Sequence, residues 1–157
     1  MVVLHAVDLF SLSPASPLGG CARSLLIKGT KSCRLTVPGC VLEGQFRTED
    51  GRFVLFLTHD APSREQLEIL LLDRDCRIEE QLRLSKADRP GALADLRLAS
   101  GGEAATFRFF AGRTFRLEVL HDPQLILSLP SLPPGARRPF SWRRSLVLTA
   151  DREADAA

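Results

Sequence analysis

The sequence predicts an all-β domain, an antiparallel β-sandwich or flattened barrel of about nine to eleven short strands with little helix. Two stretches of the chain have the pattern of a β-hairpin, with a Gly-containing turn between two strand-like segments. Residues 76–85 alternate between apolar and polar side chains. A chain of 157 residues, 45% hydrophobic and 25% charged, is large enough for one soluble domain with its own core. We expect that domain to span residues 1–150, with a disordered tail over 151–157.

The first part of the chain contains three short predicted strands. Residues 2–10 are mostly apolar, whereas 11–20 are rich in Ser, Pro and Gly and are expected to form a loop. Residues 25–28 and 33–37 are the next strands, and Pro38-Gly39 then predicts a turn.

The dipeptide Asp50-Gly51 between residues 41–49 and 52–59 predicts a β-hairpin. A two-residue loop would pair Glu49 with Arg52 and Phe46 with Leu55, and the apolar pattern agrees with that register. Residues 53–57 are apolar on both faces, which is typical of a central strand.

Residues 67–72 are predicted as a strand, although Ser63 and Gln66 could form a capping box that opens a helix over 64–72. The half-buried strand over 76–85 carries one carboxylate, Glu80, on its apolar side. Glu80 is therefore the carboxylate expected to have a shifted pKa, whereas its neighbour Glu79 points to the opposite face.

Residues 106–110 and 113–120 predict a second hairpin. A three-residue loop closed by Gly112 would set Phe107 opposite Phe115. The motif around Phe46 recurs around Phe107, at an offset of 61 residues before the turn and 62 after it, and we attribute the extra residue to this loop. A duplicated half-domain explains the repeat, as do two unrelated hairpins. Short strands are also expected at 96–98, 125–129 and 145–149, with an extended loop over 130–139.

The four cysteines, at positions 21, 33, 40 and 76, are predicted to be reduced because a core of this size does not need disulfides. Cys33 and Cys40 are not expected to be cross-strand partners across the Pro38-Gly39 turn. Reduced thiols, no apolar run of about 20 residues and no basic leader favour a cytoplasmic protein without a membrane span.

Two His-Asp pairs give a candidate metal site. His59-Asp60 and His121-Asp122 each follow an apolar strand, and two imidazoles with two carboxylates could bind zinc or another divalent metal if the fold brought the strand ends together. The structural alternative is that each Asp accepts turn amides and each His covers the end of the core.

The C-terminal part holds a basic cluster with one indole, formed by Arg137, Arg138, Trp142, Arg143 and Arg144. Such a cluster could bind phosphate or stack on bases. A solvated strand edge blunted by arginines explains it equally well, and a net charge of +2 makes a nucleic-acid partner unexpected.

No catalytic motif stands out, and no catalytic or cofactor-binding residue is predicted. The sequence therefore favours a non-enzymatic binding or interaction module for a protein partner or small ligand. The alternatives are a small-molecule or metal-binding β-barrel, with a divalent metal as its cofactor, and a weak nucleic-acid or phosphate binder. A homo-oligomer is left open.

Overall fold

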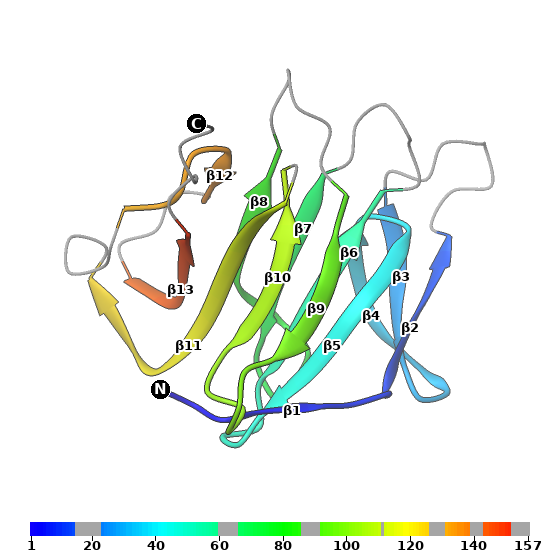
Figure 1. Ribbon diagram of the computed structural model, residues 1–157. Coiled ribbons are helices and arrows are strands. Elements are labelled where there is room, and N and C mark those ends of the chain that lie inside the picture. Colours follow the sequence, from blue (N-terminus) through cyan, green and yellow to red (C-terminus); the bar gives the residue numbers. More distant parts are fainter. Residues whose placement is uncertain are drawn as a thin grey trace.

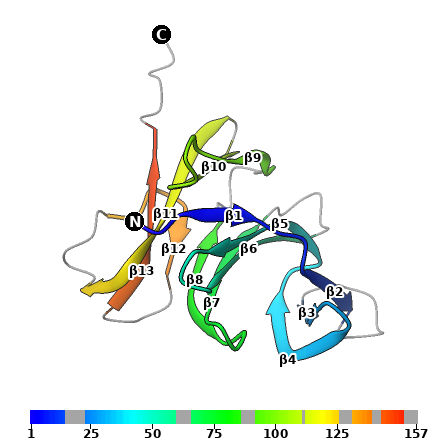
Figure 2. The same cartoon turned by 90° about the horizontal axis from the view of Figure 1, so that it is seen from below.

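The computed structural model describes residues 1–14, 23–59, 66–85, 92–110, 112–125, 131–138 and 143–151, apart from the side chain of Arg143. These residues form thirteen strands in three antiparallel sheets and contain no helix. The sheets are stacked as three layers, and none closes into a barrel (Figures 1 and 2). The predicted all-β sandwich is confirmed.

The middle layer is a six-stranded sheet with the order β1-β5-β6-β7-β8-β12. Its strands are β1 (Leu4–Ala6), β5 (Val41–Thr48), β6 (Phe53–Thr58), β7 (Leu67–Leu72), β8 (Ile78–Leu84) and β12 (Ala136–Arg137). Every residue of β6 and β7 is buried, as expected for strands covered on both faces. Residues 67–72 are thus a strand, as predicted.

Two smaller sheets cover the faces of the middle layer. One has the order β13-β11-β10-β9, formed by β9 (Ala94–Leu98), β10 (Ala105–Phe109), β11 (Arg113–Leu125) and β13 (Arg143–Ala150). The other has the order β2-β3-β4, formed by β2 (Phe10–Pro14), β3 (Arg23–Lys28) and β4 (Lys31–Pro38). Alternate side chains of β6 point into two separate cores. Val54 and Phe56 point towards the β9–β13 sheet, whereas Leu55 and Leu57 point towards the β2–β4 sheet.

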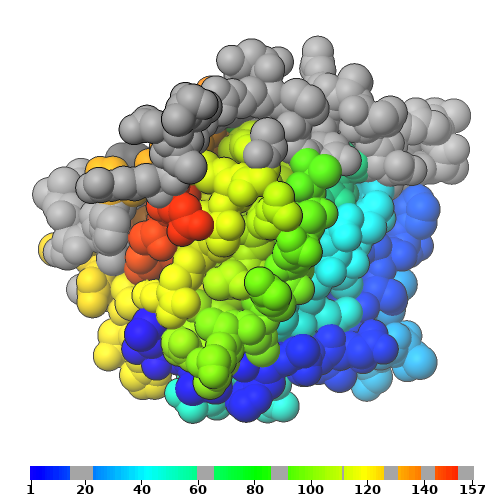
Figure 3. Space-filling model, viewed as in Figure 1, coloured from blue at the N-terminus to red at the C-terminus, as the bar shows by residue number. Residues whose placement is uncertain are grey.

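The N-terminal segment joins two of the layers. Strand β1 pairs with β5, while Val2 N donates to Val119 O (2.9 Å) and Leu4 N to Gly102 O (2.7 Å). Figure 3 shows this segment along the lower edge of the molecule, beneath β9, β10 and β11. The segment therefore holds the middle sheet and the β9–β13 sheet together at one end.

The β5–β6 hairpin is present, but its predicted two-residue loop is wrong. Thr48 N donates to Arg52 O (2.9 Å) and Gly51 N donates to Thr48 O (3.0 Å). The loop therefore holds three residues, 49–51, and Gly51 closes it with a φ of 90°.

The register of this hairpin is consequently shifted by one residue from the prediction. Phe46 opposes Val54 and not Leu55, and a further shift between Leu42 and Gly44 changes the rest of the ladder. The physical reason is the double burial of β6, because either register places apolar residues opposite apolar residues. The apolar pattern had no power to choose between them.

The register predicted for the second hairpin is confirmed, with Phe107 opposite Phe115 and Gly112 at a φ of 92°. Gly51 and Gly112 each close a loop of three residues, so corresponding loop residues of the two hairpins are separated by 61 positions throughout. Our attribution of the extra residue to the second loop alone is wrong.

Two further expectations are corrected. Phe10–Pro14 is a strand, whereas the sequence predicts a loop from residue 11; as an edge strand it tolerates Pro14. Cys40 is disulfide-bonded, so the prediction of four reduced thiols is wrong. The spacing argument addressed only a Cys33–Cys40 pair, and Cys33 is indeed a free thiol.

Several predictions fall wholly or partly outside the described residues, among them the strand at 125–129 beyond Leu125, the tail at 152–157 and the capping box at Ser63. Within the described ranges, no helix is long and apolar enough to cross a membrane.

Candidate functional site

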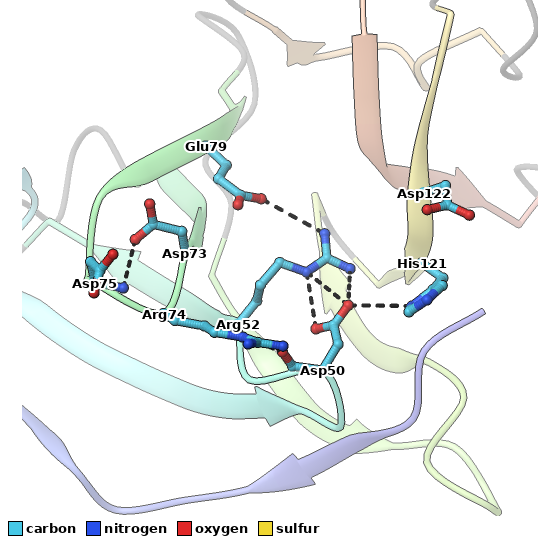
Figure 4. Close-up of a pocket in the computed structure, with 8 residues that line it drawn as sticks. All are labelled: Asp50, Arg52, Asp73, Arg74, Asp75, Glu79, His121 and Asp122. Atoms are coloured by element: carbon cyan, nitrogen blue, oxygen red, sulfur yellow. Dashed lines mark hydrogen bonds and ion pairs between the residues drawn. The ribbon is translucent and has the colours of Figure 1, made fainter.

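The turn between β5 and β6 carries an ion pair between buried Arg52 and half-buried Asp50, and this pair connects two sheets. Arg52 is 8% exposed, and its Nη2 atom donates to Asp50 Oδ2 and to the backbone oxygen of Leu120, both at 2.7 Å. Its Nε atom donates to both carboxylate oxygens of Asp50, at 3.0 and 3.1 Å. Arg52 therefore links the turn of the middle sheet to β11 through Leu120. Figure 4 shows Arg52 beside Asp50, with His121 of β11 on the other side of Asp50.

Asp50 is held in its ionised form by this arrangement. Burial alone raises the pKa of Asp50, but the hydrogen bonds from Arg52 and Thr48 and the charge of Arg52 outweigh it and lower that pKa from 3.8 to about 2. The Asp50–Arg52 pair is consequently intact over the whole physiological pH range.

A cavity of about 400 Å³ lies next to the ion pair. Its lining comes from the β5–β6 turn, the β7–β8 turn, β8 and β11 (Figure 4). The lining residues are Asp50, Arg52, Asp73, Arg74, Asp75, Glu79, His121 and Asp122, and we call this space the acidic cavity.

Five carboxylates and two guanidiniums line the acidic cavity, so with His121 neutral its net charge is −3. Both guanidiniums already have structural partners in the protein. Arg52 pairs with Asp50, and Arg74 Nε donates to the backbone oxygen of Asp50 (2.8 Å). The negative charge of Asp75 and Asp122, both exposed, thus faces solvent in the cavity.

The β7–β8 turn forms one wall of the acidic cavity. Asp73 Oδ1 accepts the backbone N–H groups of Asp75 and Arg77, both at 2.8 Å. An Asx turn of this kind fixes the backbone of the turn. On the neighbouring strand, Glu79 Oε2 lies 3.7 Å from Arg52 Nη1, and Glu79 points away from the core while Glu80 points into it, as predicted.

The structure separates the residues of the predicted metal site. His121 and Asp122 line the acidic cavity, and His121 Nδ1 lies 3.5 Å from Asp50 Oδ2. His59 follows the other end of β6, and at about 3.3 Å per residue its Cα lies about 23 Å from that of Arg52. Asp60 lies outside the described residues. In the described part of the chain, no three His, Cys, Asp or Glu side chains form a group that could hold a metal ion.

The predicted Arg–Trp cluster is divided between the surface and the interior. The side chains of Arg138 and Arg144 are 6% and 4% exposed and lie beside Glu80, at Nε–Oε1 distances of 3.7 and 3.9 Å. Arg137 is exposed on β12, while Trp142 and the side chain of Arg143 lie outside the described residues. Two of the guanidiniums are therefore turned away from any ligand at the surface.

Glu80 joins β8 to β13. Its Oε2 atom accepts the backbone N–H groups of Ser145 (2.8 Å) and Leu146 (2.9 Å), next to a shift in the β11–β13 register. Burial raises the pKa of Glu80 and outweighs the backbone hydrogen bonds and the two guanidiniums. The sequence predicts a shifted pKa for this residue without a direction, and the shift is upward; the contacts give Glu80 a structural role.

Sequence reasoning missed most of the acidic cavity. Asp50 was interpreted only as a turn residue, and Arg52 only as its neighbour. Part of the cavity could have been found from Asp73 and Asp75, two carboxylates that directly follow a buried strand in the sequence. Their proximity to His121 depends on how the sheets stack, which spacing along the chain does not encode.

Comparison of the chain with protein-family models, with curated proteins and with solved structures finds no match.

Proposed function

We propose that this domain is a non-enzymatic binding module that holds an organic cation, an amine or a guanidinium, in the acidic cavity. The observation that carries the proposal is the net charge of −3 in a cavity whose two arginines are already engaged by Asp50. A volume of about 400 Å³ suits a polyamine or the side chain of a lysine or arginine in a partner protein.

The rigidity of the lining also supports this proposal. Arg52 and Asp73 fix two walls of the cavity through hydrogen bonds to backbone groups, so little side-chain order has to be gained on binding. Asp75, Asp122 and Glu79 are exposed and are the carboxylates available to a cation.

Titration calorimetry with spermidine and with argininamide tests the proposal. We expect binding that weakens as salt is added and that weakens about fivefold in Glu79→Gln, the loss typical of one partly exposed charge contact. Asp95→Asn is the control, because it removes an exposed carboxylate on β9, outside the cavity (54% exposed, against 39% for Glu79). The absence of binding by either cation, or an equal loss in Asp95→Asn, contradicts the proposal.

A divalent cation is the second candidate ligand, because His121 Nδ1 lies 3.5 Å from Asp50 Oδ2, so that an imidazole and a carboxylate meet beside the acidic cavity. Metal analysis of the purified protein, followed by thermal melts before and after chelation, separates the two. Stoichiometric metal and a lower Tm after chelation would support a metal ligand. A metal-free protein that binds spermidine would support the organic cation.

A further inference from the structure

Two free thiols meet in the smaller core. Cys33 lies on β4, in the β2–β4 sheet, and Cys76 lies in the turn between β7 and β8 of the middle sheet, 43 positions further along the chain. Cys76 is 8% exposed and is part of the core between these sheets, and Cys33 packs against that core. Cys76 is also close enough to Cys33 to influence its protonation, so the two side chains are neighbours in this core.

The backbone is irregular at both cysteines. The β3–β4 ladder shifts between Leu25–Thr36 and Ile27–Ser32, so β4 carries three residues opposite Leu26 alone. Such a bulge changes the direction of the side chains within it, and Cys33 is one of the three. Cys76 has a φ of 63°, a left-handed conformation that is unusual for a residue other than glycine.

We propose that Cys33 and Cys76 are a redox-active dithiol, which closes to a disulfide between the β2–β4 sheet and the β7–β8 turn when a low-molecular-weight disulfide is the oxidant. The pair is distinct from the disulfide that already holds Cys40.

The reaction proceeds by two thiol–disulfide exchanges. The Cys33 thiolate, the more accessible of the two, attacks one sulfur of the oxidant and expels the other as a thiolate. The Cys76 thiolate then attacks the Cys33 sulfur of the mixed disulfide and expels the second small thiolate. The protein loses two protons and two electrons, and the oxidant is reduced to two thiols.

The environment of Cys33 predicts slow closure at neutral pH. Burial, the hydrogen bond to Cys76 and the proximity of its sulfur raise the pKa of Cys33 to about 11. Because the thiolate is the nucleophile, the rate is expected to rise about tenfold per pH unit between pH 7 and pH 9. The dithiol therefore responds to sustained oxidising conditions and not to brief exposure.

Mass spectrometry of the native protein tests the proposal without any substitution. The unreduced protein is incubated with oxidised glutathione at pH 8.5, then alkylated and digested with trypsin. We expect a disulfide-linked species made of residues 32–34 and 75–77, because Lys31, Arg34, Arg74 and Arg77 are the cleavage sites. Two alkylated thiols, or glutathione retained on Cys33 without a cross-link, would overturn the proposal.

Thermal melts provide the second measurement. A disulfide that closes a loop of this length is expected to raise the Tm by about 10 °C. Cys33→Ser and Cys76→Ser are the matched variants, since each retains Cys40 and should show no rise after the same treatment. A rise of the same size in either variant would assign the effect to other groups and contradict the proposal.

Discussion

The two cores on opposite faces of the middle sheet differ in size and in how they are closed. Among the described residues, the core towards the β9–β13 sheet contains nineteen buried hydrophobic residues, six of them Phe, whereas the core towards the β2–β4 sheet contains nine. The larger core tolerates the buried charge of Glu80 at its edge. The smaller core contains the free thiol of Cys76, and Cys33 packs against it. A core with less apolar surface has more to gain from cross-linking.

Truncation of two neighbouring β6 side chains measures how much each core contributes to the free energy of unfolding. Phe56 makes edge contacts with Phe46 and Phe107 in the larger core, so we expect Phe56→Ala to cost about 4 kcal/mol. Leu55 points into the smaller core, and Leu55→Ala should cost about 3 kcal/mol. Urea denaturation gives both values. An equal cost at the two positions would contradict the ranking of the cores, and a larger cost at Leu55 would reverse it.

The edge of the larger core is tested at Glu80. Glu80→Ala leaves the amides of Ser145 and Leu146 without their acceptor and two guanidiniums without a counter-charge, at a cost of about 3 kcal/mol. Glu80→Gln retains an acceptor for both amides and should cost about 1 kcal/mol. If the two variants lose the same stability, charge and not hydrogen bonding accounts for the role of Glu80.

The acidic cavity lies outside both cores and is expected to respond to pH. The pKa of Asp50 is lowered from 3.8 to about 2 in the folded protein, so its contribution is complete above pH 3.8 and is lost as pH falls towards 2. That contribution is about 2 kcal/mol. The free energy of unfolding, compared between the protein and Asp50→Asn, should differ at pH 5 and converge near pH 2. A difference that does not depend on pH contradicts this assignment.

The sequence was sufficient for the fold class and insufficient for its registers. The β10–β11 register follows from alternation, because Phe107 and Phe115 face one core while Arg108 and Arg116 face outward. The β5–β6 register does not, because β6 is apolar on both faces. Alternation identifies a register only where one face is polar.

The candidate site was predictable only in part, for a similar reason. His121 and Asp122 were identified by residue type and position, and they do line the acidic cavity. Their partners come from a turn some seventy residues earlier, joined through a hydrogen bond from Arg52 to the backbone of Leu120. A contact to a backbone carbonyl leaves no trace in residue type at position 120. His59 was grouped with His121 by pattern alone, although β6 carries it to the far end of the sheet.

Strands β6 and β7 are covered by a sheet on each face, and this determines which part of the molecule unfolds first. Amide hydrogens of these strands are protected by layers on both sides, whereas β2, β3 and β4 depend on the smaller core alone. In native-state hydrogen exchange, the β2–β4 sheet should therefore open first and as one cooperative unit, leaving the other two layers paired. A disulfide between Cys33 and Cys76 would tie that unit to the rest and remove this partial unfolding.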